Sequence, residues 1–327
     1  MDRNFPNAGH TQSGTGSTAD SSSSVSACSR SQSSVPDQHL AEYDSLLPPL
    51  HLDRRGFLAT SLAAGIAVAA GPVAAQTAIK TDASGLTAGE VRIPVQGGSI
   101  PAYRAMPEGQ TGMAVILVIQ EIFGVHAYIQ DVCRRLAHKG YMAIAPELYV
   151  RQGDPGRYTE ISRLLSEVVN KVPDKQIMAD LDAAVAWAGK NGGNANRLGI
   201  TGFCWGGRVV WLYAAHNPRL KAGVAWYGRL VGEADALRPR HPIDVVADIN
   251  APVLGLYGGQ DSGIPLDTIE KMKAALAKDG DAAKASEFVV YPEASHAFHA
   301  DYRPSYREAA AKDGWKRALA WFEEYLA

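Results

Sequence analysis

Apolar runs alternate with segments of helical periodicity through most of the chain. Residues 113–119, Met-Ala-Val-Ile-Leu-Val-Ile, are continuously apolar, which is typical of a strand covered on both faces. Residues 129–139 then repeat apolar positions at helical spacing and stop at Gly140, and a second buried run occupies 141–145. A strand, a helix and a strand in this order predict a parallel βαβ unit.

The same alternation continues to the C-terminus. We expect strands at 198–200, 222–227, 253–257 and 288–291, with helices at 160–172, 174–191, 206–216, 266–278 and 307–326. Residues 146–174, which include the first of these helices, are expected to cap the site. Two shorter runs of mixed polarity, 90–95 and 101–105, flank Gly97 and Gly98 and predict an antiparallel hairpin at a sheet edge. The fold class is therefore α/β, a mostly parallel sheet with helices on both faces and an N-terminal edge hairpin.

The N-terminal part of the chain differs in composition from the rest. Residues 1–52 are rich in Ser, Gly and Thr and predict a disordered leader. Residues 53–75 begin Asp-Arg-Arg-Gly-Phe-Leu, continue with a short Ala/Gly-rich apolar tract and resemble a twin-arginine export signal. We expect the twin-arginine export machinery to bind it and to deliver the protein to the periplasm, with an uncleaved, anchored helix as the alternative. The length of the leader also suggests that translation starts further downstream. The folded domain is expected over residues 85–327.

Charge and cysteine content narrow the possible partners. The chain has 32 Lys and Arg against 34 Asp and Glu, without basic runs interleaved with aromatics, which argues against nucleic acid or an anionic membrane surface as a partner. Its three cysteines, Cys28, Cys133 and Cys204, show neither metal-ligand spacing nor an even-numbered disulfide framework. A Cys133–Cys204 disulfide would consume the candidate nucleophile. We expect no metal and no cofactor, a small-molecule substrate, and a monomer.

A cysteine stands between a strand and a helix at residues 201–207, Thr-Gly-Phe-Cys-Trp-Gly-Gly. This is the pattern of a nucleophile elbow with Cys204 at its apex, where flanking glycines admit a sharp, strained turn. The positive end of the following helix favours a thiolate there. The alternative is that Cys204 is a buried structural thiol and the glycines only close a turn.

A thiol nucleophile needs a base and a group that orients the base. Asp261 follows the strand 253–257 and His296 follows the strand 288–291, in the chain order that α/β-hydrolases use. Asp261 could instead cap a helix, and His296 could be an ordinary loop histidine. The rival base is His299. The rival acids, Asp244 and Asp248, precede a strand and so belong to the opposite end of the sheet.

Glu121 follows the first buried strand, at the edge of the sheet where the site is expected. It is either part of the site or a buried carboxylate paired with an arginine elsewhere. The backbone N–H groups of Ile122 and Trp205 are the expected oxyanion donors.

Five motifs in order resemble those of the dienelactone hydrolase family: Gln-Glu-Ile-Phe-Gly (120–124), Pro-Glu-Leu-Tyr (146–149), Gly-Phe-Cys-Trp-Gly-Gly (202–207), Gly-Gly-Gln-Asp (258–261) and Ser-His-Ala-Phe (295–298). The resemblance runs from about Glu90 to the C-terminus. It implies an α/β-hydrolase whose Cys204, His296 and Asp261 triad opens lactones or esters through a thioester. It also implies that Glu121 meets the resting thiol and helps to remove its proton, and that Ile122 and Trp205 supply the oxyanion amides.

One position departs from the family pattern. The family holds its substrate carboxylate with arginines, one of them four residues after the catalytic histidine, where this chain has Ala300. Arg157, Arg163 and Arg303 are the candidate replacements. The expected function is a cysteine-dependent hydrolase of a lactone or activated ester. The alternatives are a general carboxylesterase or thioesterase, and a non-catalytic α/β-hydrolase scaffold that binds a ligand.

Overall fold

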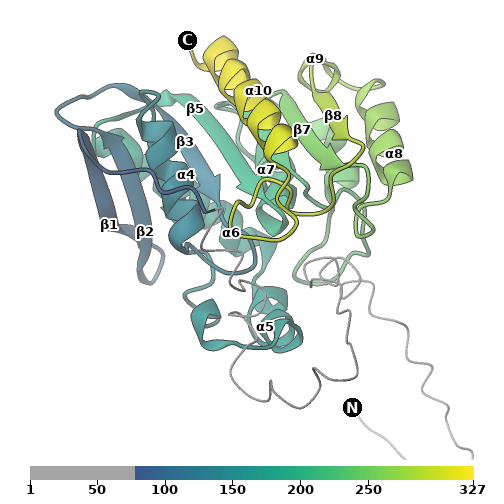
Figure 1. Ribbon diagram of the computed structural model, residues 1–327, viewed down its shortest axis with the longest axis horizontal. Helices are drawn as coiled ribbons and strands as arrows, with labels where there is room; N and C mark the ends of the chain where they lie inside the picture. Colours follow the sequence, from purple (N-terminus) through teal and green to yellow (C-terminus); the bar gives the residue numbers. More distant parts are fainter. Residues whose placement is uncertain (1–77) are drawn as a thin grey trace, which may run out of the picture. The chain divides into compact units, whose positions relative to one another are not determined.

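A computed structural model describes residues 78–327; the leader and the signal segment expected at 1–52 and 53–75 lie outside the described residues. Within the described part, one sheet of eight strands has the order β1-β2-β4-β3-β5-β6-β7-β8 (Figure 1). The strands are β1 (Leu86–Val95), β2 (Gly98–Pro107), β3 (Met113–Ile119), β4 (Met142–Pro146), β5 (Gly193–Phe203), β6 (Leu220–Trp226), β7 (Val253–Gly258) and β8 (Glu287–Tyr291). The pairs β1/β2 and β2/β4 are antiparallel and the others are parallel. The predicted fold class is thereby confirmed.

Helices cover both faces of this sheet. Figure 1 shows α4 and α10 in front of the strands and α6 and α7 behind them. The helices are α4 (Ala127–Ala137), α5 (Ile161–Glu167), α6 (Asp174–Lys190), α7 (Trp205–His216), α8 (Leu266–Leu276), α9 (Asp281–Lys284) and α10 (Glu308–Leu326), with 3-10 turns η1 (Pro155–Arg157), η2 (Val169–Lys171) and η3 (Pro242–Asp248). None of the helices in residues 78–327 is both long and apolar enough to cross a membrane.

The helix expected at 160–172 is shorter in the structure. The chain leaves the helical conformation at Val168, whose φ is −121° and ψ −69°, and continues as η2. Val168 and Val169 are both buried, and two adjacent side chains of an α-helix point about 100° apart. The break lets both valines reach the core.

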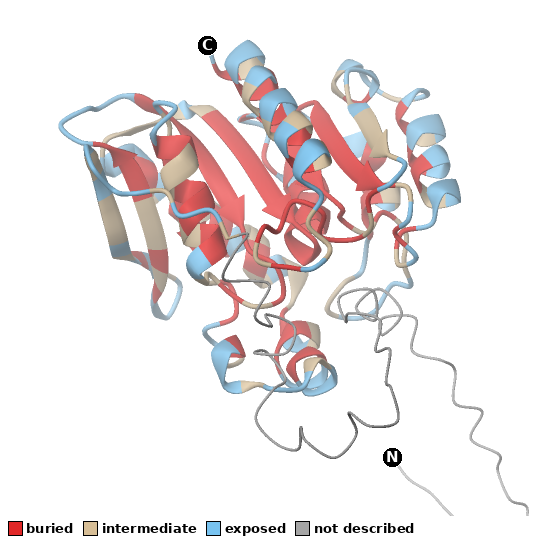
Figure 2. Ribbon diagram, viewed as in Figure 1, coloured by how far each residue is buried: buried red, intermediate tan, exposed pale blue. Residues whose placement is uncertain are grey.

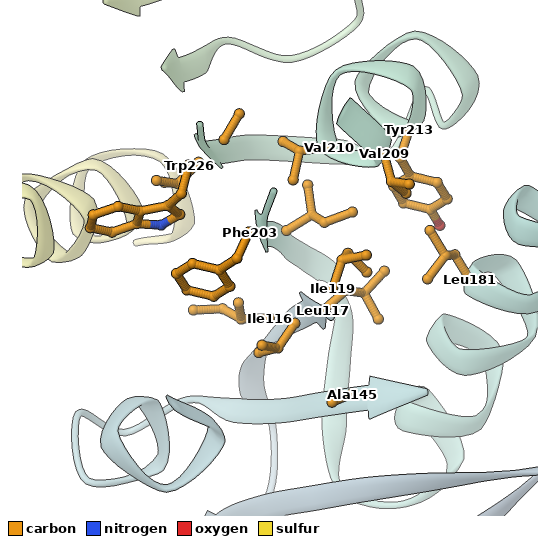
Figure 3. Close-up of a cluster of buried hydrophobic side chains, with 14 of the residues drawn as sticks. Ile116, Leu117, Ile119, Ala145, Leu181, Phe203, Val209, Val210, Tyr213 and Trp226 are labelled. Atoms are coloured by element: carbon orange, nitrogen blue, oxygen red, sulfur yellow. The ribbon is translucent and has the colours of Figure 1, made fainter. Parts of the chain in front are cut away.

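The core lies along the central strands. All seven residues of β3 are buried, and Figure 2 shows buried residues running along β3, β5 and β7. Figure 3 shows part of this core, where Ile119 of β3 lies near Val209 and Val210 of α7, with Phe203 and Trp226 nearby. Each fully buried aliphatic side chain contributes about 1.5–3 kcal/mol. The carboxyl end of β3 is therefore firmly anchored, and Glu121 follows it directly.

Residues 79–82, here called the N-terminal strap, lie against α4 before the sheet begins. The Thr81 backbone N–H donates to Asp131 Oδ1 at 2.6 Å, and Arg134 Nε donates to the Thr81 carbonyl at 2.7 Å. Arg135 then joins Asp131, at 2.6 Å, to Asp301, at 2.5 Å. Asp301 also accepts a hydrogen bond from the backbone of Ile79. The strap therefore fastens the loop that carries residues 301–303.

Candidate active site

Cys204 occupies a strained turn between β5 and α7. Its φ is 57° and its ψ is −117°, a conformation that side-chain-bearing residues rarely adopt. A Cβ on Gly202 would lie 2.3 Å from the Gly206 carbonyl oxygen, and a Cβ on Gly206 would lie 2.6 Å from the Ile119 carbonyl oxygen. Both positions require glycine. Close backbone packing in this turn thus helps to hold Cys204 at the carboxyl edge of the sheet.

His296 and Asp261 come together next to Cys204. His296 Nδ1 lies 2.6 Å from Asp261 Oδ2, and both side chains are buried. The other Asp261 oxygen accepts from the Gly263 N–H at 3.0 Å, which fixes the carboxylate in the loop after β7. Cys204 lies close enough to the His296 imidazole to raise its pKa. The three residues follow β5, β7 and β8 and lie at the same edge of the sheet.

The surroundings of His296 favour its charged form. Burial alone would lower its pKa, but the charge of Asp261, the interaction with Cys204 and the hydrogen bond to Asp261 outweigh burial and raise the pKa well above its usual value. The imidazolium form of His296, next to the Asp261 carboxylate and Cys204, is therefore favoured. This arrangement can keep Cys204 nucleophilic.

Glu121 lies in the same centre and is only 1% exposed. The Tyr302 hydroxyl donates to Glu121 Oε2 at 2.7 Å, and His126 Nε2 lies 3.6 Å from the same oxygen. Burial would raise the pKa of Glu121, but His126, Arg303 and Tyr302 together lower it below its usual value. Glu121 is therefore an ionised carboxylate inside the site, and Arg303 contributes to balancing its charge.

The start of α7, which carries one expected oxyanion amide, packs against the end of β3, which precedes the other. The contacts of Gly206 with the Ile119 and Gln120 carbonyls make this packing close. Ile122 is fully buried after β3, and Trp205 is the first residue of α7. An N–H in the first turn of a helix has no preceding helical carbonyl as its acceptor. The Trp205 amide is thus oriented away from its own helix.

Of the three candidate arginines, Arg303 is the one that enters the site. It is 3% exposed, its guanidinium lies 4.9 Å from the Phe123 ring centre, and its Nε donates to the Tyr302 hydroxyl at 3.1 Å. The side chain of Arg157 is 83% exposed and pairs with Asp154 beside a cavity of about 500 Å³ that His126 also lines. Arg163 is exposed and pairs with Glu167 at 2.9 Å. Ala300 is fully buried.

The rival residues have other roles in the structure. His299 Nδ1 lies 2.6 Å from the Tyr128 hydroxyl, and its ring stacks on Phe203. Burial lowers the pKa of His299 to about 3, so it stays neutral. Asp244 Oδ2 accepts from the His241 N–H at 2.8 Å within η3, and Asp248 pairs with Arg240 at 2.7 Å. Neither aspartate meets His296.

Three residues of this centre carried no motif in the sequence: His126, Tyr302 and Tyr227. Tyr302 and Glu121 are 181 residues apart in the chain, a separation that local patterns do not reveal. Tyr227 directly follows β6, and its place after a parallel strand was the available sign.

Cys133 and Cys204 are both free, so the structure does not contain the disulfide considered above. Burial raises the pKa of Cys133 far above its usual value. Among residues 78–327, no three His, Cys, Asp or Glu side chains are grouped to hold a metal ion.

Known proteins match this chain over most of its length. Residues 100–326 match the dienelactone hydrolase family. A protein of Methylorubrum extorquens strain AM1, provisionally named carboxymethylenebutenolidase, is 64% identical over 287 residues, which cover 87% of this chain and 97% of that protein. A Salmonella typhimurium LT2 protein with the same provisional name is 57% identical over 269 residues, 82% of this chain and 98% of its own.

A known crystal structure is also similar to this chain. The protein from Klebsiella pneumoniae, described provisionally as a dienelactone hydrolase, is 59% identical, has a TM-score of 0.71, and covers 73% of this chain and 99% of its own. This chain belongs to the dienelactone hydrolase family of α/β-hydrolase enzymes.

Proposed function

We propose that this enzyme hydrolyses a lactone or an activated ester through a thioester on Cys204. The observation that carries the proposal is the buried 2.6 Å contact between His296 and Asp261 beside a strained cysteine. His296 acts as the base and acid, and Asp261 holds its tautomer and stabilises its charge.

The proposed reaction has two halves. The Cys204 thiolate attacks the acyl carbon, and the Ile122 and Trp205 amides hold the developing oxyanion. The C–O bond breaks, the leaving oxygen takes a proton from His296, and the acyl group remains on sulfur. A water then loses its proton to His296 and attacks the thioester, which releases the acid and restores the thiolate and the imidazolium.

Glu121 and Arg303 are proposed to assist this reaction, Glu121 by accepting a proton and Arg303 by binding the substrate. Glu121 accepts the proton of a resting Cys204 thiol when bound substrate displaces its present partners. Arg303, which is buried beside Glu121, contacts the substrate. It replaces the arginine that the family has at the position of Ala300. Arg157, at the rim of the cavity near His126, is a second contact for substrate entry.

The tetrahedral intermediate expels a thiolate more readily than an alkoxide or an amide anion. Only substrates with a good leaving group are therefore expected to acylate Cys204. Enol lactones, strained lactones and thioesters are expected to react, whereas simple alkyl esters and amides react poorly. The test compares cis- and trans-dienelactone with p-nitrophenyl esters and acyl thioesters, using the natural protein and Cys204→Ala. Preference for the lactones supports the proposal, and preference for p-nitrophenyl esters assigns a general carboxylesterase instead. Full activity of Cys204→Ala on every substrate would reject the mechanism.

The signal-like segment supports a second proposal, that the enzyme is exported to the periplasm. Cell fractionation of the full chain and of a variant with Arg54→Lys and Arg55→Lys tests it. Loss of the periplasmic fraction in the variant is the expected result, and an unchanged distribution would contradict export by this route.

A further inference from the structure

Tyr227 adopts an unusual conformation at the end of β6. Its φ is 38°, which is rare for a bulky side chain, and it is fully buried. Two contacts hold it there: its N–H donates to the Leu256 carbonyl at 2.8 Å, and the following Gly228 packs on the elbow so closely that a Cβ would lie 2.2 Å from Gly207. Strain of this kind persists where the surrounding structure holds it, most often at functional sites.

The Tyr227 hydroxyl is buried without any hydrogen-bond partner in the part of the chain that the structure describes. Two other buried tyrosines, Tyr257 and Tyr213, are paired. Tyr257 donates to the Gly228 carbonyl at 3.0 Å, and Tyr213 donates to Asp182 at 3.0 Å and accepts from Asn217 at 2.7 Å. An unpaired buried hydroxyl destabilises a protein, and native structures keep few of them. The unpaired hydroxyl of Tyr227 therefore calls for an explanation.

The hydroxyl belongs to the same centre as the nucleophile. The Tyr227 ring packs edge-to-face on the His296 ring, 5.1 Å between centres. Burial raises the pKa of Tyr227 well above its usual value, and the nearby Tyr128, Glu121 and Cys204 raise it further. The phenol therefore stays neutral. Its hydroxyl can donate a hydrogen bond to an anionic or carbonyl oxygen, or accept one from a donor group.

We propose that Tyr227 is a substrate-binding residue whose hydroxyl donates a hydrogen bond to an oxygen in the acyl part of the substrate. This oxygen is distinct from the carbonyl oxygen assigned to the Ile122 and Trp205 amides. The inference rests on the proposed function, and it deepens it by naming a substrate class: esters and lactones whose acyl group carries a further oxygen. A ligand without an acceptor oxygen would leave the buried hydroxyl unpaired in the complex. The site should therefore bind such ligands less tightly.

The test removes the hydroxyl alone. Tyr227→Phe keeps the ring on His296, and Tyr213→Phe is the matched control, because it removes a buried hydroxyl that is already paired and lies on α7 away from Cys204. The substrates are p-nitrophenyl methoxyacetate and 3-methoxypropanoate, each paired with the chain of equal length that lacks the ether oxygen, butanoate and pentanoate. Urea unfolding is measured alongside kcat and KM.

For Tyr227→Phe we expect kcat/KM to fall about tenfold on at least one ether ester, mainly through KM, and to change less than about twofold on the hydrocarbon esters. Its stability should equal or exceed that of the natural protein, because no protein hydrogen bond is lost. Tyr213→Phe should lose stability and keep full activity on all four esters.

Two results would overturn the inference. Equal effects of Tyr227→Phe on ether and hydrocarbon esters would remove the proposed contact. A loss of stability without a change in kcat/KM would make the hydroxyl structural. Cys204→Ala, assayed in parallel, separates the two proposals: if its turnover is abolished, such results reject only the role of Tyr227, and if its turnover is retained, the proposed function itself fails.

Discussion

The two cysteines that the structure describes show how position alone decides the chemistry of a thiol. Cys133 lies on α4 among apolar side chains, and burial raises its pKa far above the usual value. Cys204 is just as buried but lies at the N-terminus of α7 and beside His296, which favours the thiolate. In protein beginning at residue 78, a thiol reagent should therefore modify Cys204 and spare Cys133.

Asp261→Asn tests the role of the carboxylate at His296. The amide preserves the shape of the side chain but removes the charge that raises the pKa of His296. We expect kcat to fall by about 10³-fold or more, and iodoacetamide to modify Cys204 more slowly at pH 6 to 7. Asp248→Asn, an exposed residue paired with Arg240, is the control and should change neither rate. Full activity of Asp261→Asn would remove it from the mechanism.

His299 predicts a pH dependence of stability. Its pKa in the folded protein is about 3 because of burial, against about 6.5 in the unfolded chain, so below pH 6.5 the unfolded state binds the extra proton. Stability should therefore fall as the pH drops from 6.5 towards 3, by about 3 kcal/mol between pH 6.5 and 4 from this residue.

Urea unfolding at several pH values measures this effect. His299→Gln should flatten the acid side of the profile, whatever it does to stability at pH 7. His216→Gln, at an exposed histidine paired with Asp182, is the comparison. A His299→Gln profile with the natural slope would show that His299 accepts a proton in the folded state.

At the scale of elements, the elbow depends on close packing of β3, β5 and α7. Gly202→Ala would place a Cβ 2.3 Å from the Gly206 carbonyl, a backbone atom that cannot move aside without shifting α7. We expect a loss of at least about 3 kcal/mol in the free energy of unfolding, or failure to fold. Gly189→Ala, at an exposed position of α6, meets only an ordinary contact at 3.5 Å and should stabilise the protein by about 0.5–1 kcal/mol. Circular dichroism with urea unfolding measures both, and similar stabilities would contradict the packing argument.

The elements that the sequence predicted well are those with strong periodicity. The apolar run at 113–119 matches β3, and the helix expected at 307–326 matches α10 to within one residue. The four-residue α9 was not predicted, because a single polar turn has no measurable period. The end of α5 at Glu167 was missed because tertiary burial of the two valines decided it.

Some residues of the candidate site could be predicted from the sequence, and others needed the structure. Cys204, Asp261 and His296 were recognisable because each follows a strand, and the structure brings them together. The choice of Arg303 over Arg157 and Arg163 needed the fold, since exposure separates the three. The partners of Glu121 are long-range contacts with no local pattern.

For the whole molecule, the N-terminal strap links the first described residues to the active-site loop. A chain that begins at Ala83 lacks the Thr81 and Ile79 donors to Asp131 and Asp301, whereas a chain that begins at Ala78 keeps them. We expect the shorter chain to lose about 2 kcal/mol of stability and to show a several-fold higher KM, because the loop carrying Tyr302 and Arg303 loosens. Thermal unfolding and steady-state kinetics compare the two. Equal stability and equal KM of the two chains would show that Arg135 alone holds the loop.

That the enzyme is a monomer stays a prediction, which light scattering can test.

The strap also orders the events of folding. Thr81 meets Asp131 across 50 residues, but Arg135 meets Asp301 across 166. Contacts of such long range close late, after local structure has formed, and during synthesis Asp301 is among the last residues to emerge. The sheet and the elbow can therefore form before the loop with Arg303 is fastened. Maturation of the catalytic centre should lag behind formation of the core, and a nascent chain should be compact before it is active.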